Sequence, residues 1–208
     1  MSRNDAIGIV DSGIGGLTIW KEVKKQLPNE SFLYIGDHAY QPYSGKSISV
    51  IRQRVKYLIA FLLKKGVKLI VIGCNTATVA GIDTYRTWFP GVPIIGVVPV
   101  VKMAASLTKT KHIMVMSTPF TAESSYQKRL IKIFAEACLV ENIGIPKLST
   151  YIEKGQTDER VSRLIGQFLN PETMRGVDVI ALGCSHYPFV RSEIEKIAGK
   201  DVAIIDSG

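Results

Sequence analysis

The sequence predicts an α/β protein made of two similar three-layer domains, each built on a parallel sheet. Apolar strand-like runs alternate with helical stripes along the chain, which is the pattern of parallel strands joined by crossover helices. In addition, the segments 67–74 and 177–184 are both short apolar runs that end in Gly-Cys. Because such runs are typical of strands buried on both faces, each places a thiol at the carboxyl end of a strand, where open α/β sheets bind ligands.

The elements follow from two periodicities. Strands are expected where short β-branched runs occur, at 6–10, 32–35, 67–73, 93–98, 112–116, 177–183 and 202–205. Helices are expected where apolar residues recur every three or four positions, at 17–27, 47–65, 101–107, 122–138, 158–169 and 190–197. Pro28 ends the first helical pattern, and Gly66 is placed to cap the second helix.

The spacing of these elements indicates an internal duplication. Cys74 follows Asp11 at nearly the same distance along the chain as Cys184 follows Ser117. We expect an N-terminal α/β domain over 1–96, rejoined by the C-terminal strand near 202–208, and a second domain over 97–201. A pseudo-twofold axis would relate the two domains, with the active site in the cleft between the carboxyl edges of their sheets.

Composition narrows the class of protein. The chain has 208 residues with 46% hydrophobic content, enough for a buried core. Its apolar stretches are broken well short of the roughly 20 residues of a membrane helix, and residues 1–5 lack the apolar segment of a signal peptide. We therefore expect a cytoplasmic protein without a membrane partner.

The net charge of +8 comes from lysines and arginines scattered over helical faces. They are not interleaved with aromatic residues as in proteins that stack bases, so we expect no nucleic-acid partner. A positive field would help to attract an anionic substrate. The expected partner is a small-molecule substrate, and a homodimer is the assembly that we consider.

Three cysteines, with two at strand ends, favour thiol chemistry in a reducing compartment. A structural Cys74–Cys184 disulfide and two inert buried thiols are the alternatives. Both thiols precede helix-start signals with capping side chains, and a helix N-terminus lowers the pKa of a thiol. Two thiols on opposite sides of one molecule would suit a racemase, which removes a proton from one face of a carbon and returns one to the other. Cys138, on the apolar side of a helix, is expected in the core.

The segment Asp11-Ser12-Gly13-Ile14-Gly15-Gly16 joins a strand to a helix and has two interpretations. Glycines bring backbone N–H groups close to an anion, as in dinucleotide-binding turns, and Asp37 lies where a ribose-binding acid is expected. However, Thr18 stands where that fingerprint has its third glycine, and the Asp11 carboxylate would repel a pyrophosphate. The dinucleotide interpretation is therefore the less favoured one.

Four motifs together resemble the signature of the cofactor-independent glutamate racemases: Asp11–Gly16, Pro42-Tyr43, Cys74–Thr78 and Gly183–Pro188. The resemblance runs from about Ile7 to Gly208. It implies a two-domain fold that interconverts L- and D-glutamate for peptidoglycan, without cofactor or metal.

The resemblance also implies roles for individual residues. Cys74 and Cys184 are the acid/base residues, Asp11 assists the first thiol, and His186 with Glu153 assists the second. For Glu153, a solvated position in a loop over 151–155 is the alternative. The positions that hold the substrate are Asp11, Ser12, Pro42, Tyr43, Ser44, Asn75, Thr76, Thr118, Thr121, Ser185 and His186.

The chain departs from the family pattern in three places. Ser44 stands where the family usually has Gly, with Gly45 one place later, and Ser185 replaces the usual Thr. The family also continues beyond the last residues into at least one more helix that completes the N-terminal domain. A related amino-acid racemase such as an aspartate racemase, or a truncated and catalytically impaired ligand-binding member, are therefore the alternative functions.

Overall fold

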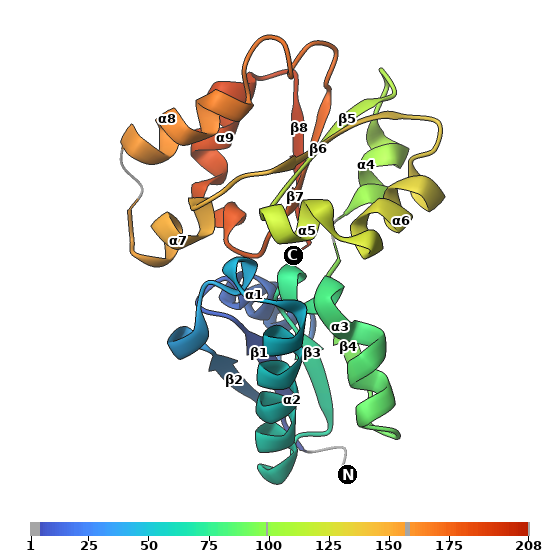
Figure 1. Cartoon of the computed structure of the whole chain (residues 1–208), viewed down its shortest axis with the longest axis vertical. Helices are drawn as coiled ribbons and strands as arrows, with labels where there is room; N and C mark the ends of the chain where they lie inside the picture. Colours follow the sequence, from blue (N-terminus) through green and yellow to red (C-terminus); the bar gives the residue numbers. More distant parts are fainter. Residues whose placement is uncertain (1–4, 99, 157–158, 208) are drawn as a thin grey trace. The chain divides into compact units, whose positions relative to one another are not determined.

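The computed structural model describes residues 5–98, 100–156 and 159–207, which form two compact units, one up to residue 98 and one from residue 100 (Figure 1). Each unit has one sheet of four parallel strands. The strand orders, β2-β1-β3-β4 and β6-β5-β7-β8, are equivalent. The expected α/β class with two similar parallel-sheet units is therefore confirmed.

The helices and strands of the first unit alternate, with two short 3-10 helices after the second strand. They are β1 (Ile7–Asp11), α1 (Gly16–Gln26), β2 (Phe32–Gly36), η1 (His38–Tyr40), η2 (Tyr43–Gly45), α2 (Ile48–Lys64), β3 (Leu69–Ile72), α3 (Asn75–Trp88) and β4 (Ile94–Gly96). The predicted ends of α2 are confirmed. The hydroxyl of Ser47 accepts a hydrogen bond from the N–H of Val50, and Gly66 has a φ of +80° just after the helix.

The second unit repeats this alternation with more helices. Its elements are α4 (Val101–Leu107), β5 (His112–Ser117), α5 (Pro119–Glu123), α6 (Ser125–Phe134), β6 (Leu139–Gly144), α7 (Leu148–Glu153), α8 (Glu159–Phe168), β7 (Val179–Gly183), η3 (Tyr187–Val190), α9 (Arg191–Ala198) and β8 (Ala203–Ile205). The expected start of a helix at 158 lies outside the described residues.

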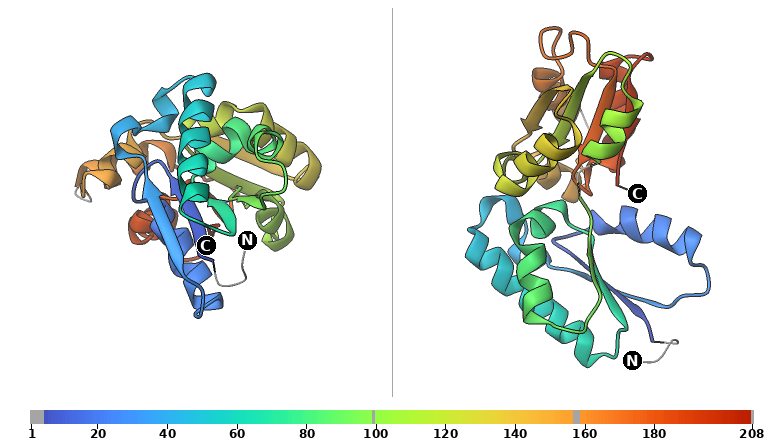
Figure 2. Two further views of the ribbon diagram at one scale, coloured as in Figure 1. Left: turned by 90° about the horizontal axis from the view of Figure 1, so that it is seen from below. Right: turned by 90° about the vertical axis from the view of Figure 1, so that its right-hand side faces the viewer.

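Each sheet is the middle layer of its unit. In the first unit, Ile7 and Ile9 of β1 pack with Ile19 of α1 and Val71 of β3, while α2 and α3 cover the other face (Figure 2, right). In the second unit, the side chains of β5 and β7 alternate between α8 with α9 on one face and α4 with α6 on the other. Burial on both faces explains why these inner strands are continuous apolar runs.

Residues 122–138, expected as one helix, form part of two helices. The chain is extended at Ser124, and the hydroxyl of this residue accepts a hydrogen bond from the N–H of Gln127 at the start of α6. A serine cap competes with helix continuation, and this ends α5 and begins α6.

Strand β6 is absent from the sequence prediction. It lies at the edge of its sheet and pairs only with β5. Glu141 and Asn142 in its middle interrupt the apolar run, because an edge strand is only half-buried.

The C-terminal strand also differs from expectation. β8 pairs with β7 in the second sheet, with Ile204 opposite Ile180. Residues 203–205 of the segment expected to rejoin the N-terminal domain therefore belong to the second sheet, because their backbone pairs with β7, and Gly208 lies outside the described residues.

No helix in the described ranges is long and apolar enough to cross a membrane.

Candidate active site

In the first unit, the candidate residues lie just after the carboxyl ends of the two inner strands. Asp11 ends β1, and Cys74 follows β3. The N–H of Gly73 donates to the carbonyl of Val10 at 2.8 Å, which holds the two strand ends side by side. The hydroxyl of Ser12 and the thiol of Cys74 are 3.6 Å apart. The order of the sheet thus brings together residues that are far apart in the sequence.

Cys74 is buried at the N-terminus of α3, where its Sγ accepts a hydrogen bond from the N–H of Ala77 at 3.4 Å. The positive end of a helix dipole and an N–H donor both favour a thiolate over a thiol. Burial first, and then the negative charge at Cys74, raise the pKa of the nearby Tyr85 hydroxyl. Tyr85 therefore stays protonated, and its O–H donates to the carbonyl of Ala77.

Asp11 is fully buried, and its Oδ1 accepts a hydrogen bond from the N–H of Gly13 at 2.8 Å. This contact bears on whether the glycine-rich turn after β1 binds a dinucleotide. The loop N–H that would face a phosphate is directed at the Asp11 carboxylate instead. Asp37, the candidate ribose acid, accepts hydrogen bonds from Tyr43 and Arg54. The nucleotide-binding alternative is therefore disfavoured.

The segment from Pro42 to Gly45 lies beside these residues through Tyr43. The Tyr43 side chain is buried, and its O–H donates to Asp37 Oδ2 at 2.7 Å. Burial, followed by the hydrogen bond to Asp37 and the charges of Asp37 and Cys74, raises the pKa of Tyr43 far above its ordinary value. Pro42 and Ser44 are half-buried on either side.

Asn75 is a buried residue whose side-chain amide is unsatisfied. It is 2% exposed, yet neither Oδ1 nor Nδ2 has a hydrogen-bond partner among the described residues. Leaving a buried polar atom unpaired costs about 1–3 kcal/mol. A buried amide with free donors and acceptors beside a thiol is what a site for a polar ligand requires. Thr76, the next residue, is buried as well.

In the second unit, Cys184 follows β7, the strand equivalent to β3. Its Sγ lies 4.0 Å from Nδ1 of His186, and Nε2 of His186 lies 2.5 Å from Oε2 of Glu153. The imidazole and carboxyl side chains are 4% and 6% exposed. A thiol, an imidazole and a carboxyl group are therefore in series.

Glu153 is the last residue of α7, not part of a solvated loop. Its loop alternative is wrong because Leu148 and Ile152 bury α7 against the core of the second unit, which brings the carboxyl group to His186.

Tyr187 fixes the turn that carries Cys184 and His186. Its fully buried O–H donates to the carbonyl of Ser117 at 2.8 Å. Burial above all raises the pKa of this hydroxyl well beyond its ordinary range, so Tyr187 remains a donor.

Thr118 and Thr121 follow β5, the strand equivalent to β1. The Thr118 hydroxyl accepts a hydrogen bond from the N–H of Thr121 and donates to the Thr121 hydroxyl at 3.0 Å. Both threonines and Ser185 are buried. Cys184, Ser185, His186, Thr118 and Thr121 thus follow the two inner strands, whereas Glu153 reaches His186 from α7.

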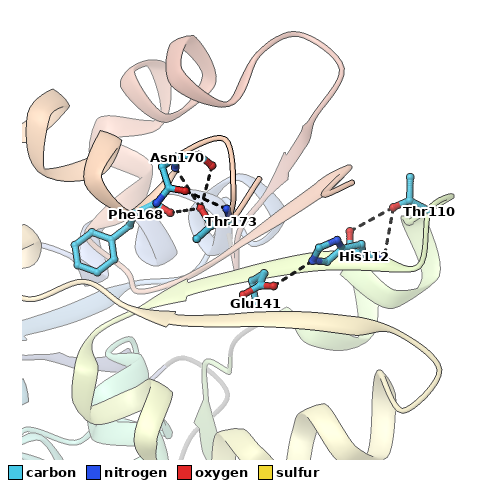
Figure 3. A network of polar contacts seen from close by, with 6 residues as sticks. All are labelled: Thr110, His112, Glu141, Phe168, Asn170 and Thr173. Atoms are coloured by element: carbon cyan, nitrogen blue, oxygen red, sulfur yellow. Dashed lines mark hydrogen bonds and ion pairs between the residues drawn. The ribbon is translucent and has the colours of Figure 1, made fainter. Parts of the chain in front are cut away.

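The amino end of the second sheet carries a separate polar network (Figure 3). At the start of β5, Nε2 of His112 lies 3.3 Å from Oε1 of Glu141 on β6, and a turn between α8 and β7 is closed by Asn170 and Thr173. Since β5 runs from His112 towards Ser117, His112 is at the opposite end of the strand from the candidate residues.

All three cysteines are free thiols, and no disulfide joins Cys74 to Cys184. Within the described ranges, no group of three or more His, Cys, Asp or Glu residues is arranged to hold a metal ion. Sequence reasoning did not single out Arg54, the partner of Asp37. Arg54 lies near Tyr57 on an exposed face of α2. The sequence pattern there indicates only that this face lies outside the hydrophobic core.

The family model described as Asp/Glu/Hydantoin racemase matches residues 7–208. A glutamate racemase from Pseudomonas entomophila is 39% identical over 99% of this chain and 78% of its own length.

Solved structures of glutamate racemases are also similar to this chain. The crystal structure of Escherichia coli glutamate racemase in complex with L-glutamate and the activator UDP-MurNAc-ala superposes with a TM-score of 0.89 at 29% identity, covering 98% of this chain and 78% of that one. The enzyme from Francisella tularensis in complex with D-glutamate has a TM-score of 0.83 at 31% identity, covering 98% and 76%.

A duplicated α/β fold with one buried thiol after the equivalent strand of each sheet, matched over nearly its whole length by racemases, defines an isomerase of the racemase class. More particularly, the chain belongs to the Asp/Glu/Hydantoin racemase family.

Proposed function

We propose that this protein is a glutamate racemase that interconverts L- and D-glutamate with the thiols of Cys74 and Cys184. The carrying observation is that equivalent strands, β3 and β7, are each followed by a buried thiol with polar groups beside it. Support for glutamate as substrate comes from the relatives named above, which are glutamate racemases.

In the proposed reaction, the thiolate of one cysteine accepts the Cα proton of glutamate, and the electron pair of the broken C–H bond is held on a planar carbanion. The thiol of the other cysteine then donates its proton to the opposite face. The reverse reaction exchanges the two roles. Each thiol must therefore alternate between base and acid, and positioned general acid–base catalysis is typically worth about 10² to 10⁴-fold in rate.

The groups beside the two thiols differ. Cys74 is at the N-terminus of α3 and has the Ser12 hydroxyl beside it, and the Asp11 carboxylate, which accepts a hydrogen bond from the N–H of Gly13, ends the adjacent strand β1. Cys184 has the His186–Glu153 pair. An imidazole held by a carboxyl group can take up and return a proton near neutral pH. We therefore assign Asp11 to the first thiol and His186 with Glu153 to the second.

The substrate would be held by buried polar groups around the thiols. Asn75 supports this assignment most directly, because its buried amide has no hydrogen-bond partner in the part of the chain that the structure describes. The other assigned positions are Asp11, Ser12, Pro42, Tyr43, Ser44, Thr76, Thr118, Thr121, Ser185 and His186. The positive net charge favours approach of the anionic substrate.

The proposed product, D-glutamate, would supply peptidoglycan synthesis. Because the mechanism needs reduced thiols, we place the reaction in the cytoplasm. The reaction as proposed uses no cofactor, so activity should survive dialysis against a chelator.

The test follows the circular dichroism of L- and D-glutamate and the appearance of solvent deuterium at Cα. We expect both signals for the unaltered chain, and loss of racemisation in Cys74→Ala and in Cys184→Ala. Cys138→Ala is the matched control, because this half-buried thiol lies in the other core cluster of the second unit. Full activity in both single variants would exclude the two-thiol mechanism. Turnover of D-aspartate but not D-glutamate would identify an aspartate racemase, and glutamate binding without exchange at Cα would identify an impaired ligand-binding member.

A further inference from the structure

Arg54 on α2 holds a buried carboxylate through two parallel hydrogen bonds. Its Nε donates to Oδ2 of Asp37 at 3.1 Å, and its Nη2 donates to Oδ1 at 2.9 Å. The Asp37 side chain is only 4% exposed, whereas that of Arg54 is 23% exposed. Such a two-pronged pair fixes the plane of the carboxylate as well as its position.

Two aromatic rings hold the guanidinium of Arg54 in turn. Its Cζ lies 3.9 Å from the ring centroid of Tyr40 and 5.2 Å from that of Tyr57. Arginine stacks on aromatic faces while its edge donates hydrogen bonds, and lysine cannot do both. The two rings therefore favour the orientation of Arg54 in which its donors are directed at Asp37.

The Asp37 carboxylate in turn holds the hydroxyl of Tyr43. Oδ2 of Asp37 accepts the hydrogen bond of the Tyr43 hydroxyl at 2.7 Å, beside the bond from Arg54. The N–H of Asp37 also donates to the carbonyl of Asp11 at 2.9 Å. One end of the arrangement is thus on the surface of α2, and the other is tied to Tyr43 and to the backbone of Asp11.

We propose that Arg54 is a positioning residue that acts through Asp37 to hold Tyr43, and with it the 42–45 segment, in the orientation that binds the substrate. This inference rests on the proposed function, since it assigns Arg54 to the binding of glutamate. Arg54 touches none of the reacting atoms and takes no part in proton transfer.

A purely structural role would have a different signature. A buried ion pair adds little net stability, because the cost of removing both charges from water offsets their attraction, but it holds its members in a fixed position. Loss of Arg54 leaves the Asp37 carboxylate buried without its counter-charge, so the 37–45 segment must rearrange. Binding should therefore suffer more than the chemical step.

The experiment measures kcat and KM for both enantiomers of glutamate in Arg54→Met and Arg54→Lys. In Arg54→Met we expect KM to rise about 10- to 100-fold, the effect of losing hydrogen bonds to a charged group, while kcat changes by less than about threefold. Arg54→Lys keeps the positive charge but cannot donate two parallel hydrogen bonds, so its KM should lie between those of the unaltered chain and Arg54→Met. Lys64→Met is the control, because it removes a positive charge from an exposed position of the same helix and should leave KM unchanged.

Two double variants separate positioning from general destabilisation. Asp37→Asn with Arg54→Met removes the uncompensated charge and keeps an acceptor for the Tyr43 hydroxyl, so KM should recover to within about threefold of the unaltered chain. Tyr43→Phe with Arg54→Met should have a KM no more than about twofold above that of Tyr43→Phe alone, since both changes break the same series of contacts.

An unchanged KM in Arg54→Met, or a loss confined to kcat, would overturn the inference. So would an equal rise of KM in Lys64→Met, which would indicate attraction by net charge alone. If the unaltered chain binds glutamate in calorimetry but does not racemise it, the proposed function fails, whereas the dissociation constants of the same variants still decide the role of Arg54.

Discussion

His186 and Glu153 form a direct contact, with Nε2 and Oε2 2.5 Å apart, although α7 and the turn after β7 are distant in the sequence. The opposite ring nitrogen of His186 faces Sγ of Cys184. Because both ring nitrogens are engaged, the orientation of the imidazole is fixed by the carboxyl group. Cys184 therefore depends on α7, an element that no active-site motif contains.

The first prediction concerns this carboxyl group. Glu153→Gln keeps an oxygen acceptor at the same place but removes the charge that stabilises a protonated imidazole. We expect kcat/KM for racemisation to fall at least about tenfold. The fall must be equal in both directions, because L- and D-glutamate are mirror images of equal free energy. Initial rates from circular dichroism in each direction measure it.

Glu195→Gln is the matched control, because Glu195 is an exposed carboxyl group of α9 in the same unit. It should leave the rate within about twofold. A Glu153→Gln variant with the unaltered rate would show that His186 needs no charged partner.

The second prediction concerns the unpaired amide of Asn75. Asn75→Ala removes two buried polar atoms that have no partner among the described residues, so the free energy of unfolding measured without ligand should stay constant or rise by up to about 1 kcal/mol. Glutamate affinity should fall about tenfold or more. Urea unfolding and calorimetric titration measure the two quantities.

Asn142→Ala provides the contrast. Asn142 Nδ2 donates to the carbonyl of Ala122 at 2.8 Å, so its loss should cost about 1 kcal/mol of stability. If Asn75→Ala is destabilised as much as Asn142→Ala, the Asn75 amide has a structural role instead of a binding role.

Sequence periodicity predicts the inner strands, which are buried on both faces, and three of the edge strands, but it misses the edge strand β6. β3 and β7 are continuous apolar runs because helices cover both of their faces, and the predicted positions of Cys74 and Cys184 follow directly. β6 has one neighbour, so Glu141 and Asn142 are tolerated within it and obscure its pattern. The strand is consequently visible only in the pairing of the folded chain.

The site shows the same division. Groups that follow a strand end, such as Asp11 and Cys74, are predictable because strand order alone brings them together. Arg54 is different, since helical periodicity indicates the face of α2 on which it lies but not the carboxylate that it meets. Long-range side-chain pairs depend on tertiary packing, and one sequence contains no signal for them.

The third prediction concerns the close approach of α1 to the site. A Cβ at Gly16 would lie 2.7 Å from Cβ of Asp11 and 3.0 Å from the hydroxyl of Tyr34. Gly16→Ala must therefore displace Asp11 or the start of α1, at a cost of about 1–3 kcal/mol in unfolding free energy. Racemisation should fall with it, since Asp11 is assigned to the first thiol.

Gly166→Ala is the contrasting variant, because a Cβ at this position meets no steric obstacle. Gly166 is within α8, and a Cβ there has no atom within 4 Å. Alanine favours helix over glycine by about 1 kcal/mol, so this variant should be more stable than the unaltered chain and equally active. Equal stability losses in Gly16→Ala and Gly166→Ala in urea unfolding would contradict the steric argument.

The last prediction concerns acid stability and Asp178, which precedes β7. Burial acts to raise the pKa of Asp178, but hydrogen bonds from the Thr108 hydroxyl and from the N–H groups of Lys109 and Thr110 outweigh it and lower the pKa to about 2. The folded state thus binds a proton at this carboxyl less readily than the unfolded chain, where the pKa is near 3.8. The stabilisation is complete above pH 3.8 and is lost as the pH falls towards 2.

Asp178→Asn removes the titrating group, so its unfolding free energy in urea should be lower than that of the unaltered chain at pH 6. The difference should narrow between pH 4 and pH 2, and a constant difference over that range would show that Asp178 does not contribute through its charge.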